Sequence, residues 1–533
     1  MKKILLSSFT ILVSLVVTAQ DAFDALRLSQ FNPVNTARIR SIGGANVSLG
    51  GDLSSAYINP AGLAQYKTNE IVLTPGFFLN SSNMKYNDSS FKKGRAALNN
   101  GASGLIVSWS NRWRSSNIKN TTISLTLNQT ANFNSDFTYR GRNTLSSYSE
   151  KWVEELVANQ VENFNNALNF FPNGASLAVE NYLVDTILSN GSIIGYRTNA
   201  NRKDFTGLDP VLDQNFIYET RGGVQEATFG AAWNFREKIL YGISVGMPFV
   251  DFRRNTIITE KDGTGNTNND FDNFRLTETF STKGAGINAR LGVIFKPVEY
   301  FRIGLTFHTP TVYSLTDRTN ATLSTNVENY ARRISGDNSK GSQFTLSTSD
   351  ITGDEDYTFT YQLTTPWRAA ASVSYVFREI KDVTKQKAFI TADVELVNYK
   401  SMSYTSGSES GGSSGNSEYF TSVNNDIDAL YRMALNARIG GELKFKTWMV
   451  RGGFNYTGSP YKKDVLPADA KAWTMTPSLG IGYRDKGMFA DLTYAHTLGR
   501  DVHFAYLLSG NNYPYARNHF NAGQLVATIG FKF

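Results

Sequence analysis

Apolar and polar residues alternate with a period of two along most of this 533-residue chain. In the segment 287–295, Ile287, Leu291 and Phe295 share one face, while Asn288 and Arg290 lie on the other. Such alternation is typical of a β-strand with one apolar and one polar face. Fourteen segments show it, near residues 70–80, 102–113, 119–139, 216–235, 238–258, 271–296, 299–318, 356–378, 386–405, 430–446, 447–459, 472–485, 487–498 and 520–533.

The connections between these segments are alternately short and long. The short ones are 236–237, 296–298, 379–385 and 484–487. The long ones are 81–101, 140–215, 259–270, 319–355, 406–429, 460–471 and 499–519. A soluble β-sandwich has no reason to collect its long loops at one end, whereas an outer-membrane barrel does. We therefore expect an all-β fold, a 14-stranded antiparallel transmembrane β-barrel.

The composition excludes several classes of protein. The chain has no Cys, which excludes a disulfide framework, Cys-ligated zinc, iron–sulfur clusters and thiol catalysis. Its net charge of +7 is not gathered into a basic block, so nucleic-acid binding is not expected. No apolar run after the N-terminus approaches the roughly 18 residues of a membrane-spanning helix.

The N-terminus predicts export. Residues 1–19 read as a signal peptide, with Lys2 and Lys3 before an apolar stretch and cleavage after Ala19. With a barrel, this places the protein in the outer membrane of a Gram-negative bacterium, among outer-membrane lipid and lipopolysaccharide. Alternation up to the terminal Phe533 looks like the strand signal read by the outer-membrane assembly machinery. Aromatic residues near strand ends are expected to form membrane-interface girdles, namely Trp109, Trp113, Tyr375, Trp448 and Tyr494.

Residues 20–69 precede the first strand of the barrel (70–533) and show no clean alternation. A 14-stranded barrel has a lumen wider than side chains alone can fill. We expect this segment to fold into the lumen as a plug, because its glycines permit tight turns and close backbone approach.

An insertion at about 149–190 within the longest outer loop has apolar residues mostly three or four positions apart, which predicts helices. Its apolar residues are candidates for the first capture of a hydrophobic ligand; they include Trp152, Phe164, Leu168, Phe170, Phe171, Leu177, Tyr182, Leu183 and Leu188. The alternative is that these helices pack on one another and on the barrel rim. Residues 406–417 are a Gly/Ser run expected to be flexible, and their G-x-S-x-G string lacks the strand–turn–helix context of a hydrolase.

The polar strand faces place many charged residues in the lumen, namely Arg290, Arg302, Arg368, Arg438, Arg451, Asp393, Glu395, Glu442 and Asp491. Arg290, Arg302 and Arg438 are candidates to bind a ligand carboxylate, since guanidinium groups suit bidentate recognition. A structural ion network between wall and plug is the alternative. No catalytic pair stands out, and the four His residues lack metal-ligand spacing, so we expect neither an enzyme nor a metal or cofactor.

The stretches 41–52 and 54–64 (SIGGANVSLGGD and SSAYINPAGLA) resemble the N-terminal hatch of the FadL/TodX outer-membrane transporters of long-chain fatty acids and aromatic hydrocarbons. The resemblance returns at 283–311, 432–445 and 454–460. It implies that Asn59-Pro60-Ala61, with Gly43, Gly44 and Gly62, belong to a plug whose shift opens a passage. It also implies a lateral opening at a kink in the third strand. Here that strand is interrupted by polar residues at 128–136, which fit either a disrupted wall or an ordinary bulge.

The resulting hypothesis is a monomeric channel for passive uptake of hydrophobic molecules, with long-chain fatty acids first among them. Some relatives of this family are labelled haemin receptors, and one branch serves protein secretion, so a haemin receptor and a secretion-system partner are the alternatives. A lumen continuous from the loops to the wall would favour transport, and a filled lumen would favour the secretion partner.

Overall fold

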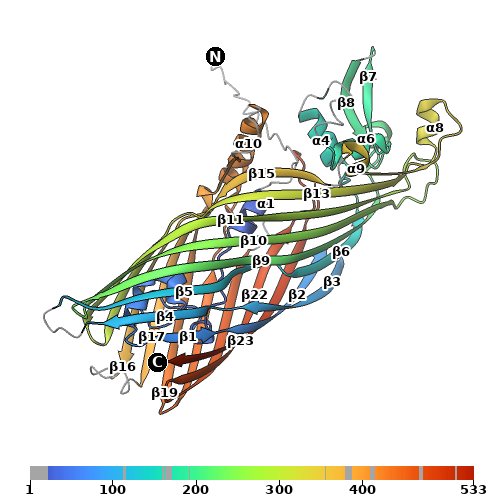
Figure 1. The fold of residues 1–533 in the computed structure, drawn as a ribbon. Helices are drawn as coiled ribbons and strands as arrows, with labels where there is room; N and C mark the ends of the chain where they lie inside the picture. The colour runs from blue at the N-terminus through green and yellow to red at the C-terminus, as the bar shows by residue number, and fades with distance from the viewer. Residues whose placement is uncertain are drawn as a thin grey trace, which may run out of the picture.

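A computed structural model describes residues 22–111, 116–158, 161, 171–190, 192–353, 356–377, 387–407, 414–466, 472–510 and 513–533. The chain forms a closed antiparallel barrel of 14 wall strands, with short turns at one end and long loops and helices at the other (Figure 1). The first wall strand closes the ring by pairing with the last, so that Gly76 lies opposite Val526. The predicted barrel is confirmed. The expected signal peptide lies outside the described residues.

Most wall strands are continuous over their described residues. These are β9 (Leu212–Phe235), β10 (Ile239–Asp262), β11 (Asn273–Val298), β19 (Met433–Phe445), β20 (Trp448–Thr457), β21 (Trp473–Asp485), β22 (Met488–His503) and β23 (Ala516–Lys532). The others consist of two collinear pieces: β1 (Glu70–Leu73) with β2 (Pro75–Tyr86), β3 (Ser89–Asn100) with β4 (Ser103–Ser110), β5 (Ile118–Asn132) with β6 (Ser135–Asn143), β12 (Phe301–His308) with β13 (Val312–Asn326), β15 (Tyr357–Thr364) with β16 (Arg368–Phe377), and β17 (Ala388–Asn398) with β18 (Ser403–Ser406).

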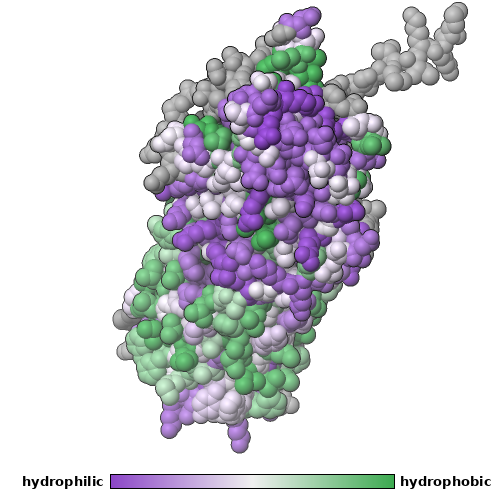
Figure 2. Space-filling model, turned by 90° about the vertical axis from the view of Figure 1, so that its right-hand side faces the viewer, coloured by the Kyte–Doolittle hydropathy of each residue, from purple (hydrophilic) through white to green (hydrophobic). Residues whose placement is uncertain are grey.

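A belt of exposed apolar side chains surrounds the half of the barrel that carries the short turns. Along β10, Ile243, Val245 and Met247 are exposed, while Leu240 and Ser244 face inward and are buried. Figure 2 shows this belt as a green band below a larger hydrophilic part. An apolar band of this kind is what a barrel presents to lipid. The predicted girdle residues Trp109, Tyr375, Trp448 and Tyr494 are exposed on the outer face, and Trp113 lies outside the described residues.

Residues 22–66, which we call the N-terminal segment, lie within the ring of strands. The segment contains α1 (Ala22–Leu28), α2 (Ala37–Ser41), α3 (Ser55–Ile58) and the 3-10 helix η1 (Pro60–Gln65). Ile39, Leu53 and Tyr57 are fully buried between the segment and the inner wall. Polar side chains of the inner wall therefore meet protein rather than an open pore.

The long-loop end carries the remaining elements, which form a cap. They are α4 (Glu150–Ala158), α6 (Ala175–Glu180), β7 (Val184–Ser189), β8 (Ser192–Thr198), α7 (Lys203–Thr206), α8 (Tyr330–Ser335), β14 (Gln343–Ser347), α9 (Thr348–Thr352) and α10 (Ser414–Leu430). The 3-10 helix η3 (Tyr399–Ser401) lies in the wall, between β17 and β18. No helix in the described part of the chain is long and apolar enough to cross a membrane.

Three expectations about the loops are wrong in part. Residues 81–101 form most of the β2–β3 hairpin rather than a loop, because the strands continue above the apolar belt with polar residues on both faces. The insertion at 149–190 is helical only in α4 and α6 among its described residues, and its end is strand β7, paired with β8. The Gly/Ser run ends in helix, because α10 already begins at Ser414.

Candidate functional site

Backbone hydrogen bonds hold the N-terminal segment against inward-facing wall side chains. The Ala37 N–H donates to Thr528 Oγ1 at 2.7 Å, and Thr493 Oγ1 donates to the Ala37 carbonyl at 2.6 Å. The Val47 N–H donates to Asp393 Oδ2 at 3.2 Å. Since Asp393 is buried, its carboxylate depends on such donors in place of water.

Serine hydroxyls form a second link at the same level. Ser48 of the segment lies with its Oγ 2.6 Å from Ser372 Oγ and 2.5 Å from Ser374 Oγ, both on β16. Ser372 in turn donates to Asp393 Oδ1 at 2.5 Å. Short side chains on both partners allow the segment to lie directly on the wall.

Glycine permits this close approach at Gly43. Its φ of +71° is in the left-handed region, and a Cβ there would lie 2.7 Å from the carbonyl oxygen of Phe454 in β20. Its neighbour Gly44 also has a positive φ, of +81°, but the nearest atom to a Cβ would be the Arg438 side chain at 3.7 Å. Only Gly43 is therefore required both by the backbone conformation and by the wall.

Asn59 ties the turn before η1 to another part of the N-terminal segment and to wall strand β12. Its Nδ2 donates to the carbonyls of Val47 at 2.6 Å and Leu305 at 3.2 Å, and its Oδ1 accepts from the Ala61 N–H at 3.1 Å. The side chain is completely buried. The Asn-Pro-Ala element thus bridges two parts of the N-terminal segment and the β12 backbone.

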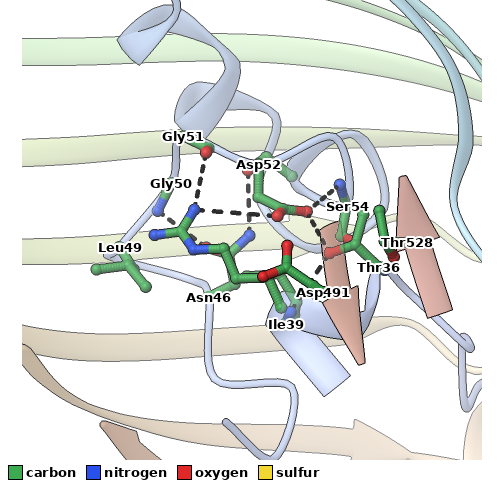
Figure 3. Close-up of polar contacts among 12 residues, drawn as sticks. Thr36, Ile39, Asn46, Leu49, Gly50, Gly51, Asp52, Ser54, Asp491 and Thr528 are labelled. Carbon is green, nitrogen blue, oxygen red and sulfur yellow. Dashed lines mark hydrogen bonds and ion pairs between the residues drawn. The ribbon is translucent and has the colours of Figure 1, made fainter. Parts of the chain in front are cut away.

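A charged network surrounds the loop of the segment that contains Asp52. Asp52 Oδ1 accepts from Thr36 Oγ1 at 2.8 Å and from the Ser54 N–H at 2.9 Å (Figure 3). Arg38 donates to the Gly51 carbonyl at 2.9 Å and lies 3.8 Å from Glu442 of the wall. The segment is therefore joined to the barrel by charge as well as by backbone contacts.

The three arginines predicted to bind a ligand carboxylate all face the lumen, but two of them donate hydrogen bonds that join parts of the protein. Arg302 donates to the Leu49 carbonyl at 2.9 Å, and Arg438 donates to Glu395 at 2.7 Å. Arg290 pairs with Glu226 at 2.5 Å through Nη2, while its Nε and Nη1 have no partner among the described residues. Arg290 therefore keeps two donor nitrogens for a ligand.

Arg290 lines a cavity of about 40 Å³ between the N-terminal segment and the inner wall. Leu28, Phe31 and His308 also line it, and His308 Nε2 lies 2.9 Å from the Ile58 carbonyl. Ligand pockets usually measure about 300–1,000 Å³, so this cavity has room for a few water molecules rather than for a lipid.

An apolar region, which we call the lumen chamber, adjoins this cavity. Ala22, Ala25 and Leu28 of α1 pack there in one cluster with wall residues that are mostly aromatic. The wall residues of the cluster include Phe133, Val224, Phe252, Phe280, Tyr313, Leu315 and Tyr361. Helix α1 therefore fills an apolar part of the lumen.

The cap buries most of the described residues predicted to capture a ligand, but Leu188 is exposed. Phe171 and Leu183 belong to a large core cluster with Trp152 and Tyr506, and Leu183 has no exposed surface. The structure thus supports packing of the insertion on itself at these positions. Phe164, Leu168 and Phe170 lie outside the described residues.

The wall ladder is interrupted between its second and third strands. β4 pairs with β5 from Ser103 opposite Leu127 onward, but above this level the described residues of β3 form no ladder with β5 or β6. Side chains join the two sides instead: Arg95 lies 3.7 Å from Asp136, and Asn80 donates to Ser135 at 3.0 Å. We call this place the seam.

The N-terminal segment supplies hydrogen bonds where the seam begins. The Asn32 and Val34 N–H groups donate to the carbonyls of Thr130 and Gln129 at 2.8 Å and 3.0 Å. The adjacent Asn128 side chain is buried, and neither of its polar atoms has a partner among the described residues. The polar interruption predicted for the third strand is therefore a break in the wall that the N-terminal segment covers from inside.

The described residues contain no group of three or more His, Asp or Glu side chains that could hold a metal ion. No family model matches the chain, and no curated protein matches it.

Solved structures do match. A Pseudomonas aeruginosa FadL homologue aligns with a TM-score of 0.54 and 12% identity, covering 95% of this chain and 100% of its own. A deltaS2 mutant of the TodX monoaromatic hydrocarbon channel aligns with a TM-score of 0.50 and 13% identity, covering 93% of this chain and 98% of its own.

The chain has the FadL fold. The FadL/TodX resemblance inferred from the glycine-rich motif is confirmed at the level of the fold.

Proposed function

We propose that this FadL-fold barrel is a passive channel for hydrophobic molecules in the outer membrane of a Gram-negative bacterium, acting as a monomer. The observation that carries the proposal is the contact of the N-terminal segment with the broken third strand through Asn32 and Val34. Movement of the segment would remove the inner cover of the seam, and a ligand would then leave sideways into the bilayer. The TodX hydrocarbon channel shares the fold, which supports a hydrophobic ligand.

Long-chain fatty acids are the proposed ligands. The lumen chamber offers an apolar surface for an acyl chain, and Arg290 at its floor has free donor atoms for a carboxylate. Guanidinium groups bind carboxylates with two parallel hydrogen bonds. A pure hydrocarbon would use the chamber but not Arg290, so the two ligand classes differ in their dependence on this residue.

Transport requires a rearrangement, because α1 fills the chamber. In the proposed sequence the ligand displaces α1, the segment shifts about Asn59-Pro60-Ala61, and the seam opens. Binding energy from the acyl chain would offset the lost packing of Ala22, Ala25 and Leu28.

A reversible lock tests this sequence. Because the chain has no Cys, the double variant Ser48→Cys/Ser372→Cys can form one disulfide between segment and wall, at hydroxyls now 2.6 Å apart. We expect uptake of labelled oleate by expressing cells to fall to background when the variant is oxidised and to recover with a reductant. Each single variant is the control, and undiminished uptake by the locked barrel contradicts the proposal.

The filled lumen favours a second candidate, a barrel that binds a protein partner and conducts nothing. Among the described residues, the small volume of the cavity at Arg290 supports this alternative. Lipid extraction and mass analysis of the purified barrel separates the two, beside a variant with Asn59-Pro60-Ala61 replaced by Gly-Ser-Gly. Bound fatty acid retained differently by the variant supports the channel, whereas empty protein and unchanged uptake in a deletion strain support the partner barrel.

A further inference from the structure

Cationic side chains gather on the outer face of β22, β23, β2 and β3, just above the apolar belt. One row across the wall consists of Arg500, His519, Asn83 and Lys92, in that order. Each of these residues lies opposite the next one on the adjacent strand. In the next row, Arg517 lies opposite Lys85. We call Lys85, Lys92, Arg500, Arg517 and His519 the outer basic patch.

The outer basic patch faces away from the barrel. Strand alternation puts its members on the same face as Leu79, Leu98 and Leu498, which are exposed. Lys85, Lys92 and Arg500 are themselves exposed.

The outward-facing positions of these two rows contain no acidic residue. Their other members are Asn83, Ser90 and Val502. The nearby Asp501 lies opposite Asn518 on the inward-facing side of the strand pair, and Asp88 lies in the β2–β3 turn. Arg500, Arg517 and Lys85 all lie close enough to His519 for their charges to act on its ring, so the four side chains form one cluster.

A second group of outward-facing cations provides a contrast on another part of the wall. Arg253 of β10 lies opposite Ser281, which lies opposite Arg318. Here Arg253 is paired with Asp251 at 3.2 Å. Lys283 is also outward-facing, directly opposite that same Asp251. Acidic neighbours therefore offset the positive charge in this group, whereas the two rows of the outer basic patch contain no acidic residue.

On β22 the outer basic patch begins at the height of lipid headgroups. Lys85, Lys92 and His519 lie further out, each six positions from the exposed leucine of its strand, namely Leu79, Leu98 and Leu525. Leu498, the last exposed apolar residue of β22, is two positions from Arg500, or about 7 Å along the strand. Headgroup layers extend roughly 5–8 Å beyond the hydrocarbon core. A cation here meets phosphate groups while the belt below it meets acyl chains.

We propose that the outer basic patch binds the phosphate groups of a phosphorylated glycolipid of the outer leaflet. Lysine and arginine together provide charge and directed donors for phosphate. The bound lipid would lie beside the free edge of β3, next to the seam. This site does not depend on what the lumen carries, although it rests on the membrane placement given under the proposed function.

The test uses the full-length barrel in detergent and purified diphosphorylated lipid A, with bound lipid counted by native mass spectrometry. Removing three charges with Lys85→Gln/Lys92→Gln/Arg500→Gln is expected to weaken binding by roughly 100-fold. The matched control, Arg253→Gln/Lys283→Gln/Arg318→Gln, removes the same charge elsewhere on the outer wall and is expected to bind as the wild type does. Oleate uptake is measured in parallel, so that failure of this proposal is separate from failure of the channel.

Equal weakening in both triple variants would overturn the proposal, since binding would then follow total charge. Undiminished binding in the patch variant would also overturn it, as would equal binding of dephosphorylated lipid A. Should the triple variant not fold, the single variant Arg500→Gln decides the question, with an expected loss of about fivefold.

Discussion

Arg451 donates from Nη1 to Asp491 at 2.5 Å inside the barrel, and the guanidinium has no exposed surface. Its Nε donates to Glu442 at 2.6 Å, so one cation holds together β19, β20 and β22. One buried guanidinium therefore binds two buried carboxylates.

Replacing Arg451 with Met should destabilise the barrel by about 3 kcal/mol, because two buried carboxylates, Glu442 and Asp491, each lose a charged hydrogen-bond donor. Urea titration of folding into lipid vesicles measures this change. Arg253→Met is the matched control on the outer face, where the exposed pair with Asp251 should contribute less than about 1 kcal/mol. A similar loss in both variants would contradict a special role for Arg451.

Gly43→Ala should loosen the N-terminal segment more than Gly44→Ala. Both positions have a positive φ, so each alanine costs about 1–2 kcal/mol in backbone conformation. Only at position 43 does the new Cβ also meet wall backbone, at 2.7 Å from the Phe454 carbonyl oxygen. Single-channel conductance in planar bilayers should rise for Gly43→Ala and stay near the wild-type value for Gly44→Ala. Equal conductance of the two variants would show that the close approach to β20 does not fix the segment.

Asn59→Asp should release the segment from the wall almost as well as Asn59→Ala does. Aspartate keeps the acceptor for the Ala61 N–H but cannot donate to the Val47 and Leu305 carbonyls. Each buried carbonyl left unpaired costs about 1–3 kcal/mol. Limited proteolysis of the purified barrel should cut residues 22–66 faster in both variants. If Asn59→Asp behaves as the wild type does, the bond to Ala61 is the important one.

Asp136→Asn should weaken the seam and speed lateral exit. Asp136 is buried and pairs with Arg95 at 3.7 Å and with Arg221. Loss of its charge removes the ion pair with Arg95, which joins β3 to β6 where no ladder does so. We expect initial oleate uptake to rise about two- to fivefold, equivalent to about 0.5–1 kcal/mol of barrier. Asp213→Asn, which breaks only the exposed pair with Arg142, should leave uptake unchanged. A rise in both variants would point to a general loosening of the upper wall.

The alternation of apolar and polar residues is enough to predict the barrel. Lipid requires apolar side chains on the outer face of every strand, whereas the lumen accepts polar side chains on the inner face. Residues 287–295 carry that pattern inside the continuous strand β11, and Arg290 points inward as predicted. Above the apolar belt this requirement disappears. The pattern therefore does not predict the strands at 81–101, and it predicts a helix for residues 184–189, which in the structure pair with β8.

The partners of the lumen charges and the position of the seam could not be predicted from the sequence, because both depend on contacts between distant segments. Nothing local distinguishes Arg290 from Arg302, yet Arg302 is engaged by the Leu49 carbonyl and Arg290 keeps free donor atoms. The burial of Phe171 and Leu183 likewise follows from packing between distant loops. The seam depends on three segments, because Asn32 and Val34 complete the third strand where its partner is absent. Residues far apart in the chain become partners through packing, so the periodicity of the sequence does not predict these contacts.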